Sequence, residues 1–149
     1  MKKIALFIAG AALLLLVSCG AKEALDYNNK LTSIQKSLFG KIDLLKDKAT
    51  IENYKKIQTE IKASIGELNV LKAPTDGLEL KNAMIDDFEL LNNEYDLEIK
   101  FLNPDIQESE KEAVKADIIN WPAKMKILDE KLITAQKKFA SAHNIKLQY

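Results

Sequence analysis

The sequence contains no arginine, a single cysteine and a single histidine. All 22 basic residues are lysines, and 22 acidic residues balance them. Arginine is the forked donor that proteins prefer for bidentate contacts to phosphates and bases. Its absence, together with the balanced charge, argues against a nucleic acid partner. One cysteine cannot form an intramolecular disulfide, so the fold must depend on a packed core.

The sequence also lacks the common catalytic and cofactor motifs. It has no G-x-S-x-G, no glycine-rich phosphate loop, no C-x-x-C-H and no Glu-x-x-His pair. His143 lies at the predicted end of the last helix, where a cationic side chain suits the helix dipole. We interpret it as a helix-end residue and not as a ligand. The inventory therefore predicts no enzyme activity, no cofactor and no metal site.

Acidic residues crowd one segment, Asp86 to Glu98. Elsewhere, and at the end of this segment, acidic residues precede lysines by four positions, as in Glu52–Lys56 and Asp96–Lys100. Pairs at this spacing are typical of a solvated helix surface. We therefore interpret the acidic side chains of the segment as solvent-facing: Asp86, Asp87, Glu89, Glu94, Asp96 and Glu98.

Turn residues are scarce, with five glycines and three prolines in 149 residues. So few turn-forming residues favour a few long helices over many short strands. Apolar residues recur at steps of three and four, which predicts helices over about 23–47, from Ile51 to "KAPTDG", from there to about Leu102, and over 109–143. The fold class predicted is all-α, an up-down antiparallel four-helix bundle. Candidate caps are Thr50 and the pairs Asp76/Glu79 and Ser109/Glu112.

The fourth predicted helix carries an unbroken heptad seam that continues through Trp121-Pro122. Because a loop would give the seam no reason to stay in phase, we predict one long helix, kinked at Pro122. The alternative is a break at "NWP", with Pro122 at the first position of a new helix. The seam residues are Val114, Ile118, Trp121, Met125, Leu128, Leu132, Ala135, Phe139 and Ala142.

The first twenty residues, "MKKIALFIAGAALLLLVSCG", have the layout of a secretory signal peptide. Two lysines precede the uncharged run from Ile4 to Val17, which is short for a membrane span. Leu16-Val17-Ser18-Cys19 resembles the bacterial lipobox. That resemblance implies cleavage between Ser18 and Cys19, and lipidation of Cys19 by diacylglycerol and an acyl chain such as palmitate. The alternatives are an uncleaved anchor and a signal peptide without lipidation.

These features divide the chain into three parts. Residues 1–18 are the predicted signal peptide, 19–22 the lipidated terminus and a short tether, and 23–149 the helical bundle. The expected partners are the membrane, through lipid on Cys19, and another protein of the envelope. The expected location is the bacterial cell envelope, at the outer membrane. The sequence does not decide between its periplasmic and its surface face.

The segments "LDYNNKLTSIQ" and "AQKKFASAHNIKL" resemble a family of small surface lipoproteins of Bacteroidota and spirochaetes. The resemblance covers most of residues 25–147 and supports the envelope location and the helical architecture. The family has no established activity, so it implies no mechanism. We therefore expect a lipid-anchored helical binding or scaffold module. The alternative is a carrier that holds a small apolar ligand, lipid or haem-like, in a crevice at Trp121 and Pro122.

Overall fold

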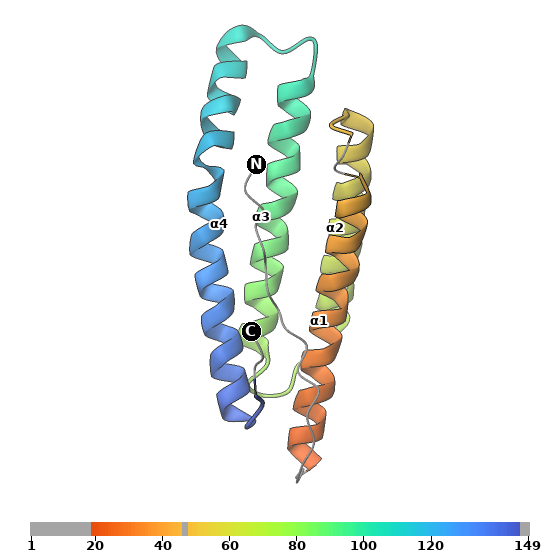
Figure 1. Cartoon of the computed structure of the whole chain (residues 1–149), viewed down its shortest axis with the longest axis vertical. Helices are drawn as coiled ribbons and strands as arrows, with labels where there is room; N and C mark the ends of the chain where they lie inside the picture. The colour runs from red at the N-terminus through yellow and green to blue at the C-terminus, as the bar shows by residue number, and fades with distance from the viewer. Residues whose placement is uncertain (1–18, 46–47, 147–149) are drawn as a thin grey trace.

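The chain forms four α-helices and no strand within the residues that the computed structural model describes, 19–45 and 48–146. The helices are α1 Cys19–Leu45, α2 Ile51–Val70, α3 Leu78–Leu102 and α4 Glu108–Ala142. Each helix packs on the next along the chain, and Figure 1 shows them running alternately up and down. The predicted all-α four-helix bundle is confirmed.

The helix ends follow the turn chemistry only in part. Thr50 caps α2 as predicted, because its side chain accepts a hydrogen bond from the Asn53 N–H at 3.2 Å. The other two predicted capping boxes are wrong, since Gly77 and Gln107 occupy the N-cap positions of α3 and α4 without a side-chain bond. After α4, Asn144 adopts the left-handed conformation with φ 55°, as expected of a residue that ends a helix.

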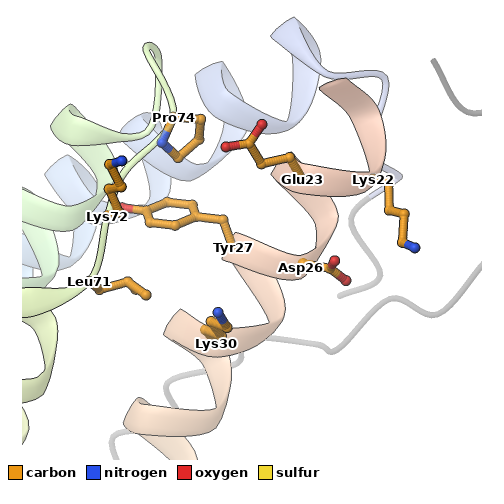
Figure 2. A pocket seen from close by; sticks show the side chains of 8 residues that line it. All are labelled: Lys22, Glu23, Asp26, Tyr27, Lys30, Leu71, Lys72 and Pro74. Carbon is orange, nitrogen blue, oxygen red and sulfur yellow. The ribbon is translucent and has the colours of Figure 1, made fainter. Parts of the chain in front are cut away.

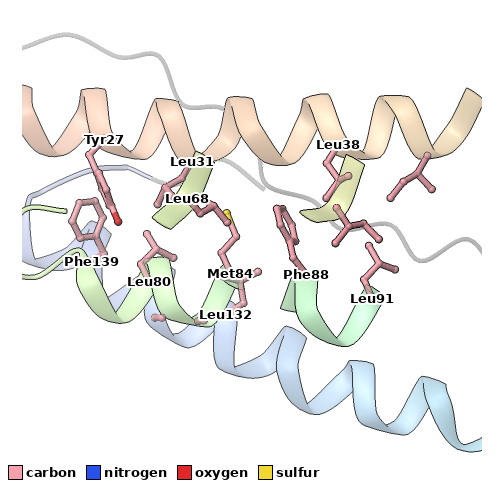
Figure 3. Packing of buried hydrophobic residues seen from close by; sticks show 14 of the residues in the cluster. Tyr27, Leu31, Leu38, Leu68, Leu80, Met84, Phe88, Leu91, Leu132 and Phe139 are labelled. Atoms are coloured by element: carbon pink, nitrogen blue, oxygen red, sulfur yellow. The ribbon is translucent and has the colours of Figure 1, made fainter. Parts of the chain in front are cut away.

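The core lies along the shared axis of the helices and consists of the apolar positions that recur at steps of three and four. Figure 3 shows Tyr27, Leu31 and Leu38 of α1 facing the apolar side chains of α3, with α4 closing the core beneath. On α4 this core includes only Leu132, Ala135 and Phe139, which belong to the last third of the helix.

Helix α4 is continuous through Pro122, so the predicted single helix is correct and the break at "NWP" does not occur. Figure 1 shows the helix bowed along its length. A proline inside a helix removes one backbone hydrogen bond and crowds the preceding turn. Pro122 itself is exposed, whereas Trp121 is buried. The heptad seam therefore outweighs the local cost of the proline.

Helix α1 begins at Cys19, four residues before its predicted start. Residues 19–22, predicted as the lipidated terminus and a short tether, form the first turn of the helix. Ala21, Lys22 and Glu23 are good helix formers, and no proline separates them from the helix that follows. The bundle therefore starts at the cysteine itself.

The two ends of the bundle differ in how the helices meet. At the Cys19 end, Tyr27 of α1 donates a hydrogen bond to the Gly77 carbonyl at 2.9 Å, and its ring centroid lies 5.6 Å from that of Phe139 on α4. At the opposite end, here the hairpin end, residues 103–107 join α3 to α4. Figure 1 shows this pair of helices reaching beyond α1 and α2.

Candidate functional site

Four carboxylates and one tryptophan gather between α3 and α4, beside the apolar core. Asp87, Glu94 and Glu98 lie on α3 at steps of seven and four, which places them on one side of the helix. Asp129 and Trp121 approach from α4. We call these five residues the acid–aromatic cluster.

Asp87 is the most deeply placed member of the cluster. Its side chain is 0% exposed, and neither carboxylate oxygen accepts a hydrogen bond within the described part of the chain. Burial, and next the charge of Asp129, raise the pKa of Asp87 to about 7. Burial also raises the pKa of Asp129, one of whose oxygens is buried without a partner. A buried carboxylate without a counter-charge is costly, so this pair favours a bound proton or cation.

Glu94 forms the second centre of the cluster. Burial first, and then the charge of Glu98, raise the pKa of Glu94 to about 7, while the Trp121 indole N–H opposes the rise. The indole N–H is buried and approaches Glu94 without completing a hydrogen bond of standard geometry. The pKa of Glu98 is raised by burial as well. The Trp121 N–H thus lacks a hydrogen-bond acceptor among the described residues, and the pKa of the neighbouring Glu94 carboxyl is raised.

Helix α2 borders the cluster through an aromatic pair. The ring centroids of Tyr54 and Tyr95 lie 5.3 Å apart with an interplanar angle of 53°. Burial, and then the charges of Glu98 and Glu94, raise the pKa of Tyr54. Burial, and then the charge of Glu94, raise that of Tyr95. The carboxylates of Glu94 and Glu98 therefore lie near two aromatic side chains, whose ring faces can attract cations.

The interpretation of the α3 carboxylates as solvent-facing is wrong for this cluster. Asp86, one residue before Asp87, faces outward and accepts a hydrogen bond from Lys131 at 2.5 Å. Glu52 and Lys56 also form the predicted surface ion pair, at 2.7 Å. Asp87 instead follows the apolar step from Leu80 and Met84 to Leu91, so the helical period predicts burial there. Position 87 was nevertheless predicted to face solvent, because its side chain is charged.

The other predicted site residues are dispersed. Cys19 is the first residue of α1, and Ser18 lies outside the described residues. Trp121 points into the cluster, whereas Pro122 faces solvent and does not contribute to it. His143 ends α4, with its ring centroid 4.6 Å from that of Phe139 and its Nε2 atom 4.0 Å from Asp76 Oδ2.

The described residues offer few other kinds of site. No group of three or more His, Cys, Asp or Glu side chains in this part of the chain is placed to hold a metal ion. Among the same residues, no helix has a stretch long and apolar enough to cross a bilayer. The acid–aromatic cluster is the candidate site that we develop, because carboxylate oxygens buried in it lack partners within the described structure.

Fold and cluster together define a class, an all-α bundle protein with carboxylates in its interior. The chain matches no protein-family model, no curated protein and no solved structure. The class thus stands on the fold and the cluster alone. The resemblance to small surface lipoproteins remains a hypothesis.

Proposed function

We propose that the protein is a lipid-anchored protein of the bacterial envelope whose bundle binds a cationic group of a partner. One observation carries the binding part of this proposal: Asp87 is fully buried beside Asp129 with both oxygens unpartnered. The lipobox around Cys19 supports the anchoring part, and the resemblance to surface lipoproteins supports the outer membrane as the location.

The anchoring proposal gives the bundle an orientation. Two or three acyl chains at a lipoprotein terminus hold a protein firmly in a bilayer. Because α1 begins at Cys19, lipid on this residue sets the Cys19 end against the membrane. The hairpin end, with the acid–aromatic cluster below it, then points away from the bilayer and toward a partner.

The charge of the hairpin end supports a cationic partner. Residues 94–112 contain seven acidic residues and two lysines. A cationic group that entered the cluster would compensate the buried carboxylates and lower their pKa values. Aromatic neighbours such as Tyr95 and Trp121 add favourable contacts for an ammonium or guanidinium group. A lysine- or arginine-rich segment of an envelope protein fits this chemistry.

The anchoring part is tested by fractionation and mass spectrometry of the protein from its host. We expect a membrane-bound chain that begins at Cys19 and carries the mass of diacylglycerol and acyl groups. Cys19→Ala should abolish both the added mass and the cleavage. A Cys19→Ala protein that keeps the wild-type mass and cleavage would overturn this part.

The binding part is tested with Trp121, which is the single tryptophan of the chain and lies in the cluster. Pentalysine is titrated into the protein at pH 7.5 while the tryptophan emission is recorded. We expect a saturable change that Asp87→Asn combined with Glu94→Gln removes. The matched control is Glu52→Gln combined with Asp86→Asn, which removes two surface charges. Equal responses of both double variants would contradict the proposal.

The alternative function, a carrier of a small apolar ligand, requires a crevice at Trp121 and Pro122. Three pockets in the described part of the chain lie along α1 and the end of α2 instead. Their linings include several charged or polar side chains. We favour the binding module because carboxylate oxygens of Asp87 and Asp129 are buried without partners in the described residues, and an apolar ligand would bring them no opposite charge.

A further inference from the structure

We propose that the Cys19 end of the bundle is itself a membrane contact, with a pocket that takes the phosphate group of an anionic phospholipid. The inference rests on the proposed anchoring at Cys19, which sets this end against the bilayer. It adds a second, non-covalent contact that selects lipids by the charge of their headgroups.

The pocket lies between the start of α1 and the loop that joins α2 to α3. It has a volume of about 380 Å³. Figure 2 shows Tyr27 crossing from α1 toward Lys72 and Pro74, with Lys30 one turn along the helix. Because the Tyr27 hydroxyl is fixed to the Gly77 carbonyl, the wall between helix and loop is held in place. The lining residues are Lys22, Glu23, Asp26, Tyr27, Lys30, Leu71, Lys72 and Pro74.

The charges of the pocket match a single phosphate. Lys22, Lys30 and Lys72 form no ion pair within the described part of the chain. Two carboxylates, Glu23 and Asp26, line the same pocket, so the lining carries one net positive charge. Lysine ammonium groups are donors that suit phosphate oxygens. The two carboxylates can accept from the hydroxyl or amine groups of a headgroup.

Exposed apolar side chains flank the pocket on the same loop. Val70, the last residue of α2, is 85% exposed, and Leu78, the first residue of α3, is 52% exposed. Large apolar side chains next to lysines are typical of surfaces that sit in the headgroup region of a bilayer. Both residues lie at the same end of the bundle as Cys19, so anchoring there brings them near the bilayer surface.

The charge of the whole bundle points in the same direction. The end of α4 meets the Cys19 end, and residues 134–146 contain three lysines and no acidic residue. Residues 94–112 at the hairpin end carry seven acidic residues and two lysines. An anionic bilayer attracts basic groups at its surface and repels acidic ones. Anchoring at Cys19 therefore brings the lysines at the end of α4 near the lipid and keeps the acidic segment 94–112 away from it.

The test uses the mature lipoprotein reconstituted into vesicles. Lipid on Cys19 caps the only thiol, so Thr75→Cys in the α2–α3 loop gives a unique site for a spin label. The accessibility of the label to a water-soluble relaxant is compared between phosphatidylcholine vesicles and vesicles with added phosphatidylglycerol. We expect phosphatidylglycerol to lower the accessibility roughly twofold. Lys22→Gln, Lys30→Gln and Lys72→Gln together should abolish the difference.

Two controls separate the outcomes. The triple variant Lys48→Gln, Lys55→Gln and Lys62→Gln removes the same charge elsewhere and should behave as wild type. Inorganic phosphate added to the phosphatidylglycerol vesicles should leave the label protected; if it releases the label, the pocket binds free phosphate and the lipid contact is overturned. A protein that fails to enter any vesicle counts against anchoring at Cys19. A protein that enters both vesicles equally, with the same label accessibility, overturns the inference alone.

Discussion

The Cys19 end and the hairpin end follow the same apolar repeat and yet have opposite interiors. At the Cys19 end, aromatic and aliphatic side chains from three helices close a dry core around Tyr27 and Phe139. Toward the hairpin end, the α3–α4 interface buries Asp87 and half-buries Glu94 beside Trp121. The core around Tyr27 and Phe139 is thus closed mainly by apolar contacts, whereas the α3–α4 interface beyond it also buries carboxylate oxygens without partners among the described residues.

The apolar core contributes enough stability for the bundle to fold despite the cost of burying these carboxylates. A buried charge without a partner is a net cost, and natural proteins usually accept such a cost at functional sites. If the cluster were only structural, apolar residues of similar size would serve better there. This cost is the reason for proposing that the acid–aromatic cluster binds a cationic group.

The largest loss of stability should come from a substitution in the core at the Cys19 end. Phe139 is 1% exposed and packs on Tyr27, so Phe139→Ala should lower the free energy of unfolding by about 3–5 kcal/mol. Phe101→Ala, in a half-buried side chain at the hairpin end, is the control and should cost clearly less. Urea unfolding followed by circular dichroism measures both. Equal losses would remove the contrast between the ends.

The next effect concerns pH and the acid–aromatic cluster. The carboxyl group of an Asp has a pKa of about 3.9 in an unfolded chain. In the folded protein, the pKa of Asp87 is about 7. Between these values the folded protein binds more protons than the unfolded one. The free energy of unfolding should therefore fall as the pH rises from 4 through 7, by about 3–4 kcal/mol for a shift of this size. Stability should be greatest at the acidic end of this range.

Asp87→Asn should remove a large share of this pH dependence and leave the part due to Glu94. Its neighbour provides the matched control, because Asp86 is partly exposed and paired with Lys131. Asp86→Asn should keep the wild-type slope. Urea midpoints at pH 4.5, 6 and 7.5 are sufficient, and a wild-type protein that gains stability over this range would contradict the assignment of Asp87.

A smaller effect tests how tightly the Cys19 end is closed. A Cβ atom at Gly77 would lie 2.8 Å from both Pro74 Cδ and Tyr27 Cε1, so Gly77→Ala should cost about 1–3 kcal/mol. Gly66→Ala is the control, because nothing lies within 4 Å of a Cβ there. In the middle of α2 this substitution should stabilise by about 0.5–1 kcal/mol. Thermal melts of the two variants should therefore shift in opposite directions.

The sequence contains enough information for the fold but not for the cluster. Steps of three and four predict all four helices, and the unbroken seam predicts a helix through Pro122. Helix ends are harder, because several residues can compete for one cap. Asp76 and Ser109 satisfy the capping pattern, but the turns place Gly77 and Gln107 at those positions.

The cluster escapes prediction because burial of a charge depends on tertiary contacts. Asp86 and Asp87 are identical side chains, and only the packing of α4 on α3 exposes one and buries the other. The sequence does place position 87 in the apolar step of α3, which is a signal of burial. The spacing of charges along the chain cannot show that Asp129 of α4 lies near Asp87 of α3.

The smallest effect lies at the junction of α1 and α2, near the hairpin end. Thr50 accepts a hydrogen bond from the Asn53 N–H, so Thr50→Ala should cost about 1 kcal/mol by leaving this donor without its cap. Thr59 bonds only the Lys55 carbonyl of its own helix, and Thr59→Ala should leave stability nearly unchanged. Hydrogen exchange of the first turn of α2 should quicken in Thr50→Ala, while exchange at the Cys19 end stays as in the wild type. Faster exchange at both ends would show that the two regions unfold as one unit. The two ends would then differ in the side chains that they bury but not in their stability.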